Sequence, residues 1–286
     1  MSKIGQYYRL TKPGIIYGNI TVLAAGVLLA ANGTINVLQL VMVVLATALI
    51  IGSACVINNY MDRGIDRKME RTKTRALVTG EISGKAALTF AGFLALIGFP
   101  LLFFFSNWLT VGLGVAAYIT YLIPYALAKR HSVHSTLVGG IAGALPPVAG
   151  YTAVVGVLDY AALLLFLIMM FWQMPHFYAI GLFRKKEYAA AHLPIATVKQ
   201  AKGDVVWQMV VYVILFAVAA LLLPLVSAAG YVYTLIMAIL SGVWLGRAIA
   251  GFRANDIEKW ARNMFIFSIR VLMVFSLLLA GEWLLP

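Results

Sequence analysis

Residues 36–66 read NVLQLVMVVLATALIIGSACVINNYMDRGID, and this stretch decides the fold class. Its first part, 36–57, carries no charged side chain and is long enough to cross a bilayer, which takes about 20 mostly apolar residues. Its last part contains Asn58, Asp62 and Asp66 at a spacing of four residues. The stretch therefore predicts a transmembrane helix that ends in a polar cluster at one membrane face.

The composition of the whole chain agrees with an integral membrane protein. Of its 286 residues, 63% are hydrophobic and 11% are charged, and the mean hydropathy is +0.93. A soluble domain is about 45–50% apolar and about 25% charged, so a soluble or disordered chain is excluded. Cys55 is the only cysteine, which also excludes a scaffold built on internal disulfides.

Nine apolar runs are long enough to span a membrane. They must be helical, because a backbone in lipid has to satisfy its own hydrogen bonds. We expect one transmembrane domain over residues 1–286, an all-α polytopic fold with spans at about 15–31, 36–57, 86–105, 108–128, 136–157, 160–182, 205–226, 231–251 and 264–285. The basic first segment resembles a signal peptide, but eight further spans favour an uncleaved first helix.

The basic residues indicate how the spans are oriented. If the N-terminus is cytoplasmic, all loop lysines and arginines fall on the cytoplasmic face, and only Arg270 lies inside a span. The net charge of +12 therefore reports topology and contact with anionic lipid rather than nucleic-acid binding. The long loops, 58–85 and 183–204, share this face, so we expect the active site there in a bacterial inner membrane.

Two further features concern helix packing. The small-residue pairs Gly139/Gly143 and Gly242/Gly246 predict close helix contacts. Prolines at membrane depth predict kinks or cavity-lining breaks, because each proline removes a backbone donor. These prolines are Pro124, Pro146, Pro147, Pro175 and Pro224.

The polar cluster after the second span has the composition of a metal–diphosphate site. Asn58, Asp62 and Asp66 share one face if the helix continues, and Glu70 extends the row by a turn. Carboxylate and amide oxygens suit Mg²⁺, which takes one or two carboxylates and completes its shell with water and phosphate. Arginines 63, 67, 71 and 75 and lysines 68 and 73 would bind the remaining phosphate oxygens.

The alternative is an ordinary helix at the membrane surface. Its Asp–Arg neighbours would then be exposed ion pairs worth about 0–1 kcal/mol each. In either case we expect Asp62 and Asp66 in a surface loop, so that replacing them leaves the fold largely intact.

Several motifs resemble those of the intramembrane prenyltransferase superfamily and, within it, the protohaem IX farnesyltransferases (haem O synthases). The N-x-x-x-D-x-x-x-D motif after the second of nine helices is typical of the superfamily. The narrower resemblance rests on four stretches in the expected order, namely Thr11–Gly14, Asn58–Leu77, Lys129-Arg130 with Gly143–Pro147, and Trp172–Phe177 with Glu187-Tyr188. The second D-x-x-x-D motif of the superfamily is missing, as it tends to be in haem O synthases.

The resemblance implies a reaction and a set of site residues. Farnesyl diphosphate would be ionised with Mg²⁺, and a vinyl group of haem B would take the farnesyl group, with water adding to give haem O. Asn58, Asp62 and Asp66 would be catalytic and would hold the metal, with Glu187 as a further ligand. The diphosphate would be bound by basic residues, namely Arg67, Arg71, Lys73, Arg75 and Lys186.

Haem contacts are expected from His176, Gln173 and His131. Imidazole is an axial ligand of haem iron, and a polar residue within a span is a functional candidate. The resemblance also implies haem A synthase or a terminal oxidase as a partner. Three alternatives remain at this stage: a prenyltransferase with another aromatic acceptor such as a quinone precursor, a membrane transporter, and a non-catalytic haem-handling assembly factor.

Overall fold

Nine helices long and apolar enough to cross a membrane occur within residues 2–284, which the computed structural model describes. No strand occurs in these residues, so the predicted all-α multi-pass fold is confirmed. Residue 285, the predicted end of the ninth span, and the outermost residues of the predicted 1–286 domain lie outside the described part. The spanning helices are α2 (Pro13–Ala31), α3 (Val37–Asp66), α5 (Gly84–Phe105), α6 (Trp108–Leu122) with α7 (Pro124–His131), α8 (Ser135–Val155), α9 (Tyr160–Phe183), α12 (Lys202–Leu222), α13 (Tyr231–Ile249) and α14 (Ile257–Gly281).

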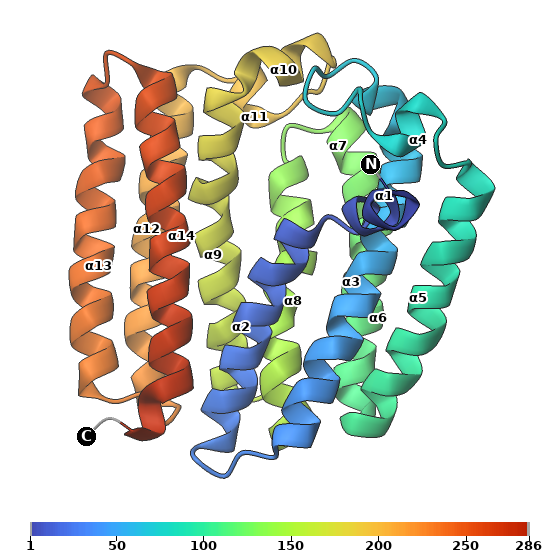
Figure 1. Cartoon of the computed structure of the whole chain (residues 1–286). Helices are drawn as coiled ribbons and strands as arrows, with labels where there is room; N and C mark the ends of the chain where they lie inside the picture. The colour runs from blue at the N-terminus through green and yellow to red at the C-terminus, as the bar shows by residue number, and fades with distance from the viewer. Residues whose placement is uncertain (1, 285–286) are drawn as a thin grey trace.

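Short helices gather at one end of the bundle, at the top of Figure 1. They are α1 (Lys3–Leu10), α4 (Ala76–Thr79), α10 (Lys185–Ala190) and α11 (Ala196–Lys199). We call this the basic end, because the loops that carry most lysines and arginines lie here. Short 3₁₀ turns follow three of the spans, η1 (Leu223–Leu225), η2 (Ala250–Arg253) and η3 (Glu282–Leu284).

Polar caps fix where several helices begin. The side chains of Asn36, Ser83, Asn107, Asp159 and Asp256 each accept a hydrogen bond from a backbone N–H three residues ahead. Such a cap satisfies one of the four free N–H groups of a helix start and stabilises it by about 1 kcal/mol. The cap at Asp256 starts the last helix at Ile257, earlier than the predicted residue 264, because the polar first turns continue the helix outside the apolar run.

The fourth span is divided in two. Ile123 has φ −113° and ψ −73°, and the chain restarts as α7 at Pro124. Proline has no N–H to continue the ladder and restricts the residue before it, which accounts for the break. The predicted irregularity at Pro124 is confirmed, and it redirects the short helix that carries Lys129 and Arg130.

The helices α2 and α8 pack with their backbones in direct contact. A Cβ atom built on Gly26 would overlap the carbonyl oxygen of Pro147, and one on Gly150 would overlap that of Leu23. Gly139 and Gly143 also meet neighbouring helices closely, through side chains on α7 and α9. The predicted packing role of Gly242 and Gly246 is wrong, because a Cβ at either position meets no atom within 4 Å.

We predict that Gly150→Ala lowers the thermal inactivation midpoint of the detergent-purified protein. The added methyl group has to push two backbones apart, and overpacking of this kind costs about 1–3 kcal/mol. Gly246→Ala is the matched control, since it adds the same group in open space and gains helix propensity. Equal midpoints for the two variants would contradict the assignment of the α2–α8 contact.

Candidate active site

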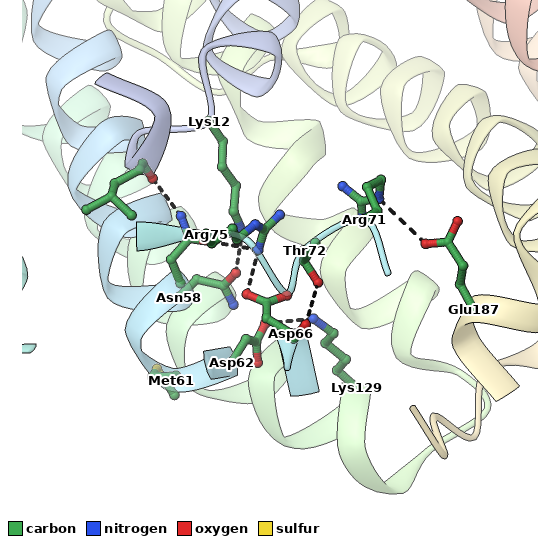
Figure 2. Close-up of polar contacts among 12 residues, drawn as sticks. Lys12, Asn58, Met61, Asp62, Asp66, Arg71, Thr72, Arg75, Lys129 and Glu187 are labelled. Carbon is green, nitrogen blue, oxygen red and sulfur yellow. Dashed lines mark hydrogen bonds and ion pairs between the residues drawn. The ribbon is translucent and has the colours of Figure 1, made fainter. Parts of the chain in front are cut away.

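The last turns of α3 carry the polar motif on a single face. Asn58, Asp62 and Asp66 follow one another by one helical turn each, as the sequence predicted, and Figure 2 shows them side by side. Their exposed fractions are 2%, 2% and 5%. The expectation of a surface loop is therefore wrong for Asp62 and Asp66, since both lie on the buried face of a helix. Replacing them will affect stability as well as chemistry.

Basic side chains from three separate segments converge on this face. Lys129 Nζ on α7 lies 2.6 Å from Asp62 Oδ2, and Arg130 Nη2 lies 3.1 Å from Asp62 Oδ1. Arg75 Nη1, from the loop after α3, lies 2.6 Å from Asp66 Oδ2. Buried carboxylates need such partners, because an unpaired charge out of water is strongly disfavoured.

Lys12 reaches the same cluster from the junction between α1 and α2. Its Nζ donates to Asn58 Oδ1 at 2.6 Å (Figure 2). Its backbone has φ 54° and ψ 66°, a left-handed conformation that is uncommon for a residue with a side chain and that concentrates at functional sites. Burial lowers the pKa of the Lys12 ammonium from 10.5 to about 8.

The loop after α3 folds back over the motif instead of extending the helix. Thr72 Oγ1 donates to the Asp66 carbonyl at 2.9 Å, and Arg75 returns to Asp66 and to Asn59 Oδ1 at 3.0 Å. The predicted extension of the acidic row to Glu70 is therefore wrong. Glu70 instead makes an exposed ion pair with Lys73, with 2.6 Å between Oε1 and Nζ.

A cavity of about 470 Å³ runs from this cluster into the bundle. Its polar end contains Lys12, Asp62, Asp66, Arg71, Arg75 and Lys129, and its deeper walls come from α2, α3, α6, α8, α9 and α14. Met69 and Leu193 line the cavity at the basic end and belong to one small apolar cluster, so the two long loops pack on each other there. Ile15 on α2 and Phe177 on α9 line the cavity although they are 41% and 45% exposed.

Some predicted residues line this cavity and others do not. His176 and Gln173 lie on its α9 wall, where Gln173 Nε2 donates to the Gly140 carbonyl at 2.7 Å. Arg71 and Arg75 lie at its polar end. Four predicted residues have exposed side chains and do not belong to its wall: Arg67, Lys73, His131 and Lys186.

Glu187 lies across the mouth of the site from the aspartates (Figure 2). One of its oxygens accepts a hydrogen bond from Arg184 at 2.8 Å. The other lies 3.9 Å from Arg71 Nε and has no hydrogen bond. Glu187 thus connects α10 to the loop after α3, and in this arrangement its charge is shared by two arginines.

Sequence reasoning assigned no role to several residues that build the site. Lys12 and Lys129-Arg130 stood in the motifs that carry the resemblance, and this was the only signal for them. Asn59 likewise stood within the Asn58–Leu77 stretch; its Nδ2 donates to the Leu10 carbonyl at 2.8 Å and connects α3 to the end of α1. Ser268, which hydrogen-bonds His176, lies on α14 far along the chain.

The donor set at the polar end fits Mg²⁺. Two carboxylates and the amide oxygen of Asn58 lie one turn apart, and the buried Asn58 Nδ2, which has no hydrogen-bond partner, can donate to a phosphate oxygen. No group of three or more His, Cys, Asp or Glu residues that could hold a metal ion occurs among residues 2–284. These side chains therefore suit an ion that completes its shell with water and phosphate, as Mg²⁺ does.

Comparison with known proteins agrees with this geometry. The model of the UbiA prenyltransferase family matches residues 19–269. This chain belongs to the UbiA prenyltransferase family. Relatives named protoheme IX farnesyltransferase from Klebsiella pneumoniae and Citrobacter koseri are 45% identical over 282 residues, with 98% of this chain and 96% and 95% of theirs aligned. The one from Cronobacter sakazakii is 44% identical over 284 residues, covering 99% and 96%. The chain is thus a prenyltransferase by family, and no feature of a transporter is needed to explain it.

Solved structures of the UbiA fold match the whole bundle. Digeranylgeranylglyceryl phosphate synthase superposes with a TM-score of 0.81 at 18% identity, covering 99% of both chains. A UbiA homologue from Archaeoglobus fulgidus bound to GPP and Mg²⁺ has a TM-score of 0.64 at 16% identity, covering 96% of this chain and 99% of its own. These likenesses confirm the fold of this UbiA family member.

We predict that Asp66→Asn lowers the free energy of unfolding by on the order of 2 kcal/mol. The change removes a charged hydrogen bond and leaves the Arg75 guanidinium without its counter-charge, and losses of that size are typical of buried charged partners. Glu70→Gln makes the same chemical change at an exposed pair and is expected to stay within about 0.5 kcal/mol. Thermal midpoints in detergent measure both, and indistinguishable midpoints would refute the buried pair.

Proposed function

We propose that this protein transfers the farnesyl group of farnesyl diphosphate to a vinyl group of protohaem IX (haem B), giving haem O and diphosphate. One observation carries the proposal: a buried pair of aspartates, surrounded by basic side chains, lies at the polar end of an otherwise apolar cavity. That combination suits a ligand with an anionic head and a long apolar tail. Relatives that are 45% identical and named protoheme IX farnesyltransferase support the choice of substrates.

The head group binds among the buried charges. Asp62 and Asp66, with Asn58, would hold Mg²⁺, which would supply positive charge to neutralise the diphosphate. Lys12, Lys129 and Arg130 contact the same Asn and Asp side chains and would turn toward the diphosphate when it binds. Arg71 and Arg75 approach it from the loop after α3.

The outer basic residues act at longer range. Arg67, Lys73 and Lys186 are exposed in the two long loops of the basic end, where their charge attracts the anionic head group. Glu187 orients Arg71, and it is the nearest acidic residue of the second long loop for a further metal contact.

Bond breaking and bond formation both depend on the enclosure of the cavity. The C–O bond of farnesyl diphosphate breaks with the electron pair leaving on diphosphate, and fixed cations stabilise that charge more in the transition state than in the ground state. The vinyl carbon attacks the allylic cation, and water then adds its oxygen and releases one proton. Packing of Met69 and Leu193 limits water at the basic end before the new carbon–carbon bond forms.

The haem substrate packs against the α9 wall. Gln173 and His176 line the cavity there, and the exposed His131 at the basic end would contact a propionate. We infer that a planar porphyrin of this polarity enters past Ile15 of α2 and Phe177 of α9, two exposed residues that also line the cavity.

The protein is a multi-pass integral membrane protein, and we assign it to the bacterial cytoplasmic membrane with the basic end in the cytoplasm. The excess of Lys and Arg in the loops of that end supports this orientation. Haem A synthase or a terminal oxidase is the partner expected to receive the product, and no nucleic acid is involved.

The decisive experiment combines purified protein in nanodiscs with haem B, farnesyl diphosphate and Mg²⁺, and identifies products by mass spectrometry. We expect hydroxyethylfarnesyl haem that disappears when Mg²⁺ is chelated, and a loss of at least about 10²-fold in rate for Asp62→Asn. The folded variant, checked by gel filtration, is the control for misfolding. Transfer of farnesyl to an aromatic acid but not to haem would overturn the acceptor, and no consumption of farnesyl diphosphate would overturn the site.

A second variant tests the role of Lys12. We predict that Lys12→Met lowers kcat/KM for farnesyl diphosphate by about 10²-fold, because the positive charge that stabilises the leaving diphosphate is lost. Lys199→Met removes the same charge from an exposed position outside the cavity and should change kcat/KM less than about twofold. If both variants behave alike, Lys12 does not contact the diphosphate.

A further inference from the structure

The imidazole of His176 is held rigidly between aromatic rings. Trp172 stacks on it with 4.7 Å between ring centroids and 25° between planes. Phe265 of α14 lies at 4.9 Å, and Phe177 meets its edge at 5.2 Å. Trp172 is itself fixed by a 2.8 Å hydrogen bond from Nε1 to the Ser268 carbonyl. The ring plane of His176 is thus set by α9 and α14 together.

The hydrogen bonds of Ser268 determine which imidazole nitrogen carries the proton. Ser268 Oγ lies 2.8 Å from His176 Nδ1 and 2.6 Å from the Phe265 carbonyl oxygen. A carbonyl only accepts, so the single hydroxyl proton of Ser268 goes to Phe265. Ser268 Oγ must then accept from His176, and Nδ1 carries the hydrogen. In the neutral imidazole this leaves the lone pair on Nε2.

His176 Nε2, which carries this lone pair, is therefore free to bind a ligand. No hydrogen bond within residues 2–284 uses Nε2 of His176, and no carboxylate of that part of the chain lies within ion-pair distance of the ring. His176 lines the cavity beside Trp172, Gln173 and Leu272. An imidazole whose Nδ1–H is fixed by a hydrogen bond and whose Nε2 is free has the arrangement of a metal ligand.

The residues around His176 limit which kind of metal species can bind there. No three-residue group of His, Cys, Asp or Glu that could hold an ion is found in the described chain, so a bare cation would meet a single nitrogen here. A metalloporphyrin brings four nitrogens of its own and needs only an axial ligand. The apolar and aromatic walls also suit a porphyrin face.

We propose that His176 Nε2 is the axial ligand of the haem iron during the reaction, and that Ser268 is a positioning residue that sets the tautomer and orientation of His176. The inference rests on the proposed function, because it takes haem as the occupant of the cavity. The iron is then anchored on α9, which fixes the porphyrin by its centre and leaves its edge to face the diphosphate end.

Resonance Raman spectroscopy of the full-length protein in nanodiscs, loaded with haem B and reduced, tests the ligand directly. We expect an iron–histidine stretching band in the wild type that is absent in His176→Ala. Added imidazole should restore a band in that variant, which shows that its pocket is folded. His134→Ala is the matched control, since His134 is exposed and lies outside the cavity wall, and it should retain the band.

Ser268→Ala tests the positioning role with the same measurement. The band should persist at a lower frequency, because an imidazole without a hydrogen-bond acceptor at Nδ1 is a weaker base, and haem affinity should fall by about 10-fold. An unchanged frequency would overturn the role of Ser268. A band that survives in His176→Ala, or no band in the wild type, would overturn the ligand.

Product formation is measured on the same wild-type preparation. If haem O is formed while the His176→Ala band persists, the ligand assignment fails and the proposed function stands. If the histidine band is present but no farnesyl haem is formed, the proposed function fails.

Discussion

Charge compensation around two buried carboxylates is the constraint on which the basic end of the bundle depends. Asp62 and Asp66 lie at the end of a transmembrane helix, where unpaired charges are strongly disfavoured. Their partners come from a short helix after a proline break and from a loop that folds back on α3. The loop 67–75 has a single apolar residue, Met69, so its hold on α3 depends largely on the ion pair and hydrogen bonds to Asp66. In the proposed function, the cations of these pairs are the ones that contact the diphosphate.

Different interactions therefore stabilise the helix bundle and the polar site. The helices associate through close packing, most tightly where Gly26 and Gly150 bring α2 and α8 into backbone contact. The polar end is held by charged hydrogen bonds between residues distant in sequence. A ligand that exchanges its own charges for the internal pairs can rearrange the loops without disturbing the packed helices.

Local patterns in the sequence predicted the parts of the structure that depend on local physics. Apolar runs identified every spanning helix found in residues 2–284, and the four-residue spacing of Asn58, Asp62 and Asp66 identified their shared face. Helix ends were less accurate, since the cap at Asp256 lies outside the apolar run. The predicted extension of the acidic row to Glu70 was wrong, because the chain turns back after Asp66 and lets Thr72 and Arg75 hydrogen-bond to it.

Contacts between segments that are distant in the sequence could not be predicted from the sequence. Lys12 meets Asn58 across 46 residues, Lys129 meets Asp62 across 67, and His176 meets Ser268 across 92. Nothing in the spacing of one segment specifies which helix packs beside it. A serine within an apolar helix carries no distinctive pattern, so Ser268 was visible only once α9 and α14 were placed together.

The exposed residues that line the cavity on α2 and α9 have a consequence for how a ligand moves between the protein and the bilayer. Ile15 of α2 and Phe177 of α9 line the cavity and are also exposed, while Met69 and Leu193 pack together at its basic end. A large apolar molecule that passes between these helices moves directly between protein and bilayer and never crosses water. After it leaves the protein, such a molecule reaches the next membrane protein by lateral diffusion in the bilayer, so the distance between the two proteins sets the time that this takes.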